Sequence, residues 1–198
     1  MLKNFHNLGI YTWYSSVLQI VDKYDLNCTV SSSMTMNSVK SYTKRTIHKS
    51  YETTWANLLS DCTGKLRTYS KFKCKLQPEH HLKLKNVKQR TNITRFRVSS
   101  HNLEIERARY VRNPLPAEER ICKQCTMELV EDEFHALIVC PHYSTSRGVL
   151  FAEADKVNTL FSTLKTEDKL IYLLQCKDPN IVKLLGTHIS NINDNRVM

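Results

Sequence analysis

Three cysteines and one histidine lie close together in the second half of the 198-residue chain. Their spacing is C-x2-C-x9-H-x4-C, at Cys122, Cys125, His135 and Cys140. Two thiolates two residues apart can turn inward from one tight turn, and a borderline-soft cation such as Zn²⁺ accepts three sulfurs and one imidazole in a tetrahedron. Because four protein ligands leave no open position on the metal, the pattern predicts a structural Zn²⁺ site.

The second half of this pattern requires a break in the backbone. Residues 130–139 are compatible with a helix, on which positions five apart lie about 140° apart around the axis. Cys140 must therefore leave the last turn to reach a metal that His135 holds. Pro141 favours this departure, because proline disfavours the α conformation in the residue before it.

Two alternatives to this ligand set stay open at the level of sequence. The three cysteines could be small buried core residues beside a surface histidine, since free cysteine often behaves as a small hydrophobe. His142, two residues after Cys140, competes for the fourth ligand position.

Basic residues concentrate upstream of the cysteines. The chain has 29 Lys and Arg against 19 Asp and Glu, a formal charge of +10, whereas residues 40–97 alone hold fifteen cations and three acids, or +12. This bias favours an anionic partner, RNA or DNA first, although a solvated helix face is the alternative. The candidate phosphate contacts are Lys83, Lys85, Lys88, Arg90, Arg95 and Arg97.

Four aromatic residues near the basic stretch could stack on unpaired bases. They are Tyr69, Phe72, Phe96 and Tyr110. For Phe72 and Phe96 the helical spacing favours packing in a core instead, whereas the role of Tyr110 is more open.

Composition limits the class of protein. With 41% hydrophobic residues, four Gly and five Pro, the chain can bury a core, which excludes disorder throughout. Single cysteines at Cys28, Cys62, Cys74 and Cys176 argue against a disulfide framework. No run approaches 18 apolar residues and no signal-peptide layout opens the chain, so we expect no membrane partner and a soluble intracellular protein, in the nucleus or the cytoplasm.

Hydrophobic periodicity predicts a mainly α fold, an irregular helical bundle with a small zinc-knuckle module. Asp178 and Pro179 read as the N-cap and first position of a last helix, and residues 99–116 read as a loop. The predicted helices cover residues 11–26, a long stretch from Ser38, 65–76 and 84–98, with a polar linker at 27–37. The predicted organisation is an N-terminal helix at 1–30, a basic helical region at 38–112, a zinc-binding module at 113–152 and C-terminal helices at 153–198.

Most of the chain resembles the C-terminal region of invertebrate-type non-LTR (LINE-type) retrotransposon endonuclease/reverse transcriptases. The resemblance rests on Trp13–Leu26 (WYSSVLQIVDKYDL), Trp55 with its helix, Thr94–Tyr110 (TRFRVSSHNLEIERARY), Glu118–Cys125 (EERICKQC) and Glu131–Tyr143 (EDEFHALIVCPHY).

This resemblance implies a mobile-element origin, a thumb-like remnant at residues 1–30, and a CCHC zinc-binding segment that grips RNA or DNA during target-primed reverse transcription. The three cysteines and His135 match the family's ligand pattern. Its basic approach segment corresponds to Arg95, Arg97, His101, Arg107, Arg109 and Arg112. The resemblance therefore adds Arg107, Arg109 and Arg112 to the candidate nucleic-acid contacts.

The catalytic motif of a polymerase is missing from the sequence. No aromatic-x-Asp-Asp tetrad is present, and the nearest acidic run, Glu131–Glu133, lies between the predicted zinc ligands. Two-metal phosphoryl chemistry needs carboxylates that converge on one site. We therefore expect a nucleic-acid-binding fragment that is not an enzyme.

Three alternatives to this function remain. The chain could be a non-functional structural remnant of a mobile element or a protein-interaction module. An enzyme that pairs a Cys nucleophile with His80, His81 or His101 has no recognisable local signature in the sequence.

Overall fold

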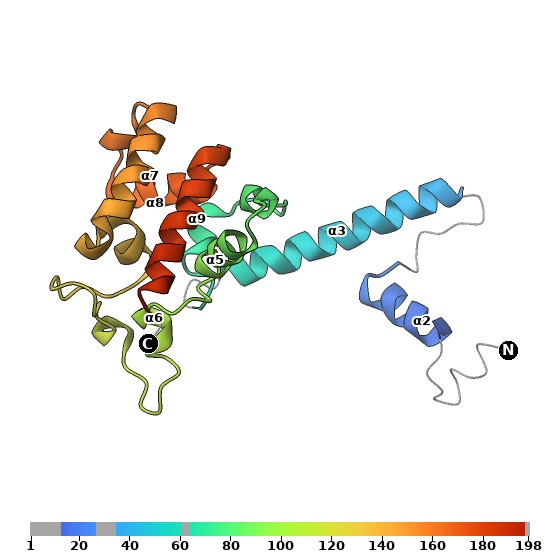
Figure 1. Cartoon of the computed structure of the whole chain (residues 1–198). Coiled ribbons are helices and arrows are strands. Elements are labelled where there is room, and N and C mark those ends of the chain that lie inside the picture. The colour runs from blue at the N-terminus through green and yellow to red at the C-terminus, as the bar shows by residue number, and fades with distance from the viewer. Residues whose placement is uncertain (1–12, 27–34, 61–63, 197–198) are drawn as a thin grey trace. The chain divides into compact units, whose positions relative to one another are not determined.

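A computed structural model of the chain describes residues 13–26, 35–60 and 64–196 (Figure 1). Across these ranges the structure contains helices and one isolated β-bridge and no strand, so the predicted mainly α fold is confirmed. Within the same ranges, no helix has the length and apolar character that crossing a membrane requires. Most of the predicted linker at 27–37 lies outside the described residues.

The chain divides into two compact units, Met1–Leu58 and Leu59–Met198. The first unit holds α2 (Trp13–Lys23) and nearly all of α3 (Met36–Ser60), which confirm the two helices predicted there. Thr35 caps the N-terminus of α3, because its hydroxyl oxygen accepts a hydrogen bond from the Ser38 N–H at 3.3 Å. No residue of α3 is buried.

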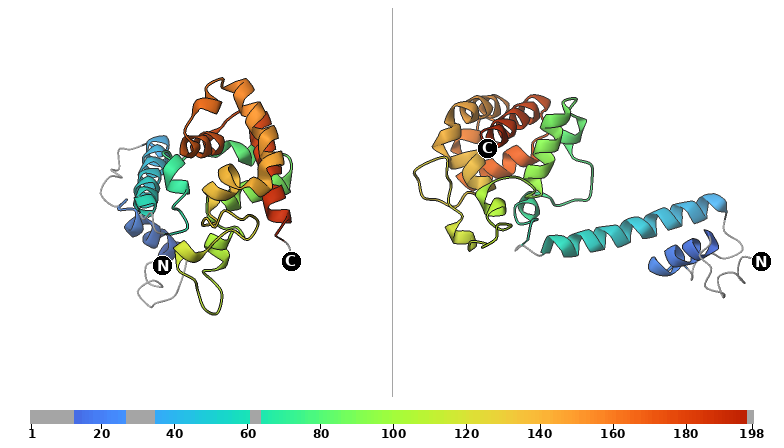
Figure 2. Two further views of the ribbon diagram at one scale, coloured as in Figure 1. Left: turned by 90° about the vertical axis from the view of Figure 1, so that its left-hand side faces the viewer. Right: turned by 60° about the horizontal axis from the view of Figure 1, so that its bottom comes forward.

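The described part of the second unit contains seven short helices and four of ten or more residues (Figure 2). Its buried apolar side chains form one hydrophobic core. Helices labelled η are 3-10 helices, except η3, which is a π-helix. In chain order the helices of the second unit are α4 (Tyr69–Phe72), η1 (His80–Lys83), α5 (Val87–Arg97), α6 (Glu104–Arg107), η2 (Ala117–Glu119), η3 (His135–Val139), η4 (Pro141–Tyr143), α7 (Ser144–Val157), η5 (Phe161–Thr163), α8 (Thr166–Gln175) and α9 (Pro179–Asp194).

Helices α5 and α9 pack closely against each other. A Cβ atom placed on Gly186 of α9 would lie 2.9 Å from Cβ of Gln89, so only glycine allows this approach. Asn92 donates a hydrogen bond to the Ser190 hydroxyl at 3.0 Å across the same contact. The predicted start of α9 is confirmed, since an Asp178 carboxylate oxygen accepts hydrogen bonds from the N–H groups of residues 180 and 181.

Two predicted elements need correction. The basic helix expected at 65–76 is only the four-residue α4, because the backbone is extended at Lys73, whose ammonium donates to the carbonyl of Gln77 at 2.7 Å. The loop expected at 99–116 contains α6, in which Glu104, Ile105 and Glu106 are all buried.

The segment predicted as a zinc-binding module is continuous with its surroundings in space. Leu137 and Leu150, from residues 113–152, share one core with Phe161 and Leu173, from residues 153–198. Helix α7 begins at Ser144 and runs across the predicted boundary at 152. The predicted metal ligands are therefore held by the main core of the second unit.

Candidate metal centre

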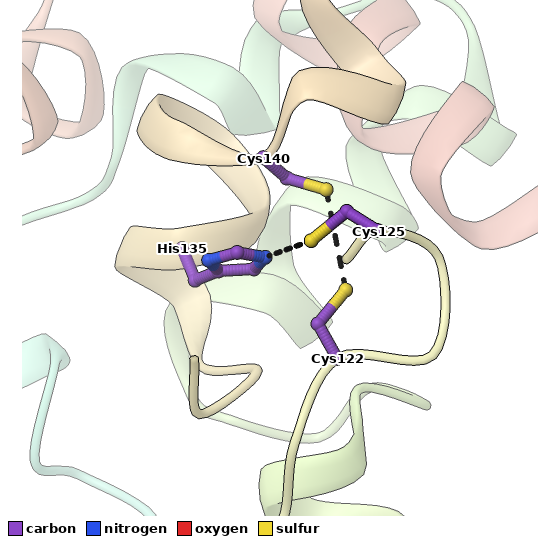
Figure 3. Close-up of side chains that lie close together, drawn as sticks. All are labelled: Cys122, Cys125, His135 and Cys140. Carbon is purple, nitrogen blue, oxygen red and sulfur yellow. Dashed lines mark hydrogen bonds between the residues drawn. The ribbon is translucent and has the colours of Figure 1, made fainter. Parts of the chain in front are cut away.

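The four predicted ligands converge on one point (Figure 3). One ligand atom from each of them lies within 4.8 Å of all the others. The Sγ atoms of Cys122 and Cys140 are 4.0 Å apart, and Cys125 Sγ is 3.4 Å from Nε2 of His135. A tetrahedral zinc ion with metal–ligand distances of about 2.0–2.3 Å has ligand–ligand edges of roughly 3.5–3.8 Å, so the group could hold one such ion.

The two N-terminal ligands sit in a narrow antiparallel turn. Ile121 and Val130 form the isolated bridge, and the Cys122 N–H donates to the carbonyl of Leu129 at 2.9 Å. The N–H of Gln124 points at Cys122 Sγ from 3.4 Å, which is how a tight turn after the first cysteine presents a donor to its sulfur. This local geometry aims both sulfurs to the same side.

The two C-terminal ligands are aligned by the π-helix η3. The Cys140 N–H donates to the carbonyl of His135, five residues earlier, at 2.7 Å. A π-helical turn is closed by a hydrogen bond between residues five apart. It places those two residues on more nearly the same side of the helix than an α-helix, in which they lie about 140° apart. The backbone then leaves the helix at Cys140, where ψ is 120°, as the proline at 141 predicts. The π turn itself was not predicted.

The choice between His135 and His142 is settled by their positions. His135 is 2% exposed and belongs to the cluster. His142 is exposed, lies outside the cluster and packs edge-on against Tyr143, with ring centroids 4.9 Å apart. His135 is therefore the histidine that could complete the site.

Burial sets the protonation of the ligands when no metal is bound. It raises the pKa of Cys122, whose thiol donates to a carboxylate oxygen of Glu131 at 3.0 Å, and it also raises the pKa of Cys140. Burial lowers the pKa of His135, which keeps the imidazole neutral and ready to bind a cation. Binding a metal must therefore release thiol protons, which couples its affinity to pH.

The carboxylate of Glu131 links the Cys/His cluster to two other parts of the second unit. Besides the Cys122 thiol, it accepts from the backbone N–H of Glu104 at 2.9 Å and from both terminal nitrogens of Arg196, one of them at 2.6 Å. The side chain of Glu131 has no exposed surface. One carboxylate thus connects the cysteine turn, the start of α6 and the residues just after α9.

Glu133 anchors a second set of segments. Its carboxylate accepts from Arg67 at 2.8 Å and Thr68 at 2.9 Å, lies 2.8 Å from a ring nitrogen of His101 and also accepts from Ser99. Burial alone would raise its pKa, but the hydrogen bond and charge of His101 and the charge of Arg67 outweigh it and lower the pKa to about 2. Both carboxylates at the ends of the acidic run are engaged inside the protein.

Arg97 is wrongly predicted as a nucleic-acid contact. It lies one turn after Ile93 on the buried face of α5 and is 4% exposed. Its guanidinium stands 4.3 Å from the ring centroid of Phe72, forms an ion pair with Glu79 at 2.8 Å and donates to the carbonyl of Leu174. Arg97 joins α5 to its neighbours and cannot reach a phosphate in solvent.

The other eight predicted contacts reach the surface to different degrees. Three of them form ion pairs on the protein: Lys88 with Asp194, Arg107 with Glu104 and Arg109 with Glu106. Arg90 and Arg109 are half-buried. The exposed members are Lys83, Lys85, Lys88, Arg95, Arg107 and Arg112.

The aromatic candidates separate clearly. Phe72 and Phe96 are 3% and 0% exposed, which confirms that they pack in the core. Tyr110 is 67% exposed, with the Lys65 ammonium 5.3 Å from its ring centroid. It borders an open groove whose polar lining was not predicted, since no sequence pattern relates Lys65 to residues 99–102.

Comparisons with known proteins add no name to this arrangement. No protein-family model, no curated protein and no solved structure matches the chain. The features of the described residues that bear on function are the cluster of Cys122, Cys125, His135 and Cys140 and the charged surface.

Proposed function

We propose that the chain is a zinc-stabilised nucleic-acid-binding module, a C-terminal fragment of the LINE-type reverse transcriptases that it resembles, without a polymerase core. The observation that carries nucleic-acid binding is the surface of residues 65–97. Glu79, the single acid of this segment, is turned to buried Lys73 and Arg97. Seven cations of the segment are exposed: Lys65, Lys71, Lys75, Lys83, Lys85, Lys88 and Arg95.

Such a one-sign surface differs from an ordinary solvated face, on which both signs are mixed. Lys88 is the only one of the seven exposed cations for which an ion pair is formed among the described residues, with Asp194 at 2.8 Å. The remaining six are available to phosphates. Each contact would release condensed counterions from the nucleic acid, which gives affinity with little sequence preference.

Zinc is the metal that we propose for the Cys/His cluster. Three thiolates and a neutral imidazole form a soft, closed tetrahedral set, which suits structural zinc better than the hard cations that prefer oxygen. The ion would hold the cysteine turn against η3. Glu131 and Glu133 lie between the ligands Cys125 and His135 in sequence, so by holding this segment the ion would also order α6 and the turn after α5.

Binding is tested by titrating labelled single-stranded RNA, single-stranded DNA and duplex DNA with the full chain at about 50 and 200 mM salt. We expect affinity to fall steeply with salt. The variant Arg95→Glu should lower the log–log salt slope by roughly 0.7 for single strands or 0.9 for duplex per lost contact. The matched control is Lys156→Glu, at an exposed position of α7, which makes the same charge change outside residues 65–97.

Absence of binding at low salt would contradict the proposal, as would equal effects of the two charge reversals. Either result favours the alternative that the basic residues are a solvated face of a structural remnant.

We also propose that the chain does not polymerise nucleic acid. Support comes from Glu131 and Glu133, whose carboxylates are buried and engaged by protein donors, so that this acidic run is not free to hold magnesium. Primer extension by the purified chain with Mg²⁺ and deoxynucleotides would refute this directly.

A further inference from the structure

The groove beside Tyr110 has features that the predicted phosphate contacts lack. It has a volume of about 470 Å³ and is open to solvent. Its walls come from the turn after α5, from α6 and the residues that follow it, and from Lys65. Its polar and aromatic lining residues include Lys65, Ser100, His101, Asn102, Arg107 and Tyr110.

The accessible charge in the groove is positive. Lys65 is exposed, and the Arg107 side chain is 56% exposed although it also pairs with Glu104. Among the described residues that line the groove, only Glu106 carries a carboxylate. Its side chain is 3% exposed and forms an ion pair with Arg67 at 2.5 Å. An anion entering the groove therefore meets two accessible cations and no accessible carboxylate.

Tyr110 provides a stacking surface beside this charge. With two thirds of its area exposed, the ring is not used by the core, and Lys65 lies over it at a cation–π distance of 5.3 Å. Ser100 and Asn102, from the turn after α5, also line the groove, are exposed, and can donate and accept hydrogen bonds. A flat ring, two cations and short polar groups suit a base with its flanking phosphates.

Hydrogen bonds from the segment that carries His135 hold both α6 and the turn after α5, the two parts of the chain that form most of the groove. The Glu104 N–H at the start of α6 donates to the carboxylate of Glu131, four residues before the ligand His135. On the other wall, Ser99 and His101 both contact Glu133, two residues before the ligand His135. A groove that is already ordered loses less entropy when a ligand binds.

We propose that this groove binds single-stranded nucleic acid, with an unpaired base stacked on Tyr110 and the backbone phosphates beside Lys65 and Arg107. The proposal rests on the proposed function and specifies it, because a duplex keeps its bases paired and cannot offer one to the ring. An acidic peptide could use the two cations but gains nothing comparable from an exposed aromatic platform.

The test compares the full chain with Tyr110→Ala and Tyr110→Phe, using a labelled single-stranded oligo(dT), an oligo(U) and a duplex of equal length. Base–aromatic stacking of about 1–3 kcal/mol corresponds to about 5-fold to 150-fold in affinity. We expect Tyr110→Ala to weaken single-strand binding by at least about 5-fold, Tyr110→Phe to restore it, and duplex binding to change less than about 2-fold. Unchanged zinc content and thermal midpoint would verify that all three proteins are equally folded.

The outcomes separate this inference from the proposed function. Wild-type binding to single strands with no loss in Tyr110→Ala, or an equal loss on duplex, overturns the groove assignment and leaves nucleic-acid binding standing. Poly-glutamate is used as a competitor for the labelled single strand. If it displaces the strand completely, and equally well from wild type and from Tyr110→Ala, the groove is assigned to an acidic peptide and the groove proposal is overturned. Failure of the wild-type chain to bind any of the three nucleic acids at low salt overturns both.

Discussion

Replacing Glu133 with glutamine tests the internal role of the acidic run. The substitution keeps the shape of the side chain and removes its charge from Arg67 and His101. The pKa of Glu133 is lowered from 4.5 to about 2, so the charged form contributes roughly 3 kcal/mol to folding, at about 1.4 kcal/mol per pKa unit. Breaking one partner out of a buried ion pair independently costs about 3–5 kcal/mol. We expect Glu133→Gln to lower the free energy of unfolding by about 3 kcal/mol at pH 7.

The sign of the pH dependence follows from the same shift. A carboxylate with a lowered pKa in the folded state contributes its full stabilisation above pH 4.5 and loses it as the pH falls toward 2. A measurement at pH 7 therefore sees the whole effect. Urea unfolding with saturating zinc is the assay, with zinc content measured on the same samples. The control is Glu118→Gln, an exposed carboxylate that should change stability by less than about 0.5 kcal/mol.

Equal stability of the two variants would refute the reasoning. It would mean that Glu133 gains no more from its partners than it loses by leaving water. Loss of zinc from Glu133→Gln alone would show instead that the carboxylate acts by positioning the ligand His135.

Three further predictions concern other parts of the second unit. Purified chain should contain one zinc; Cys125→Ser should lose it with several kcal/mol of stability, since structural zinc contributes about 10–16 kcal/mol in small sites, whereas the exposed Cys74→Ser should retain it. Burial lowers the pKa of His188 to about 4, so folding favours its neutral form: the free energy of unfolding is unaffected by protonation of this residue above pH 6.5 and decreases as the pH falls toward 4. Urea unfolding should show a decrease in the free energy of unfolding between pH 7 and pH 5, and this decrease should be about 2 kcal/mol smaller in His188→Gln. Gly186→Ala should lower the thermal midpoint, with a cost of about 1–3 kcal/mol from overpacking against α5, whereas Gly148→Ala, which meets nothing within 4 Å, should be neutral or stabilising.

Local features of the chain were predictable from sequence. The ligand set depends on residues within nineteen positions of one another, and the departure of Cys140 from its helix follows from the proline beside it. The start of α9 at Asp178 and Pro179 depends on the capping of nearby N–H groups. In each case the decisive interaction lies within a few turns of backbone, where residue type and spacing are sufficient.

The direction of charged side chains was decided by tertiary structure. Arg95 and Arg97 are two residues apart in a basic helix, yet one is exposed and the other is buried against Phe72 and Glu79. Glu131 and Glu133 read as an acidic run, but they accept from donors on segments far away in sequence. Burying such groups is favourable only when distant partners satisfy them, and sequence does not show which partners those are.

The groove beside Tyr110 depends on the same long-range contacts. Sequence determined that a tyrosine and several cations are present, and that a metal cluster of soft ligands can form. Only tertiary structure decided that Lys65 lies over the ring of Tyr110, because Glu131 and Glu133 hold α6 and the turn after α5 in position. The physical reason is that a surface is assembled from segments whose relative positions come from the packing of the whole unit.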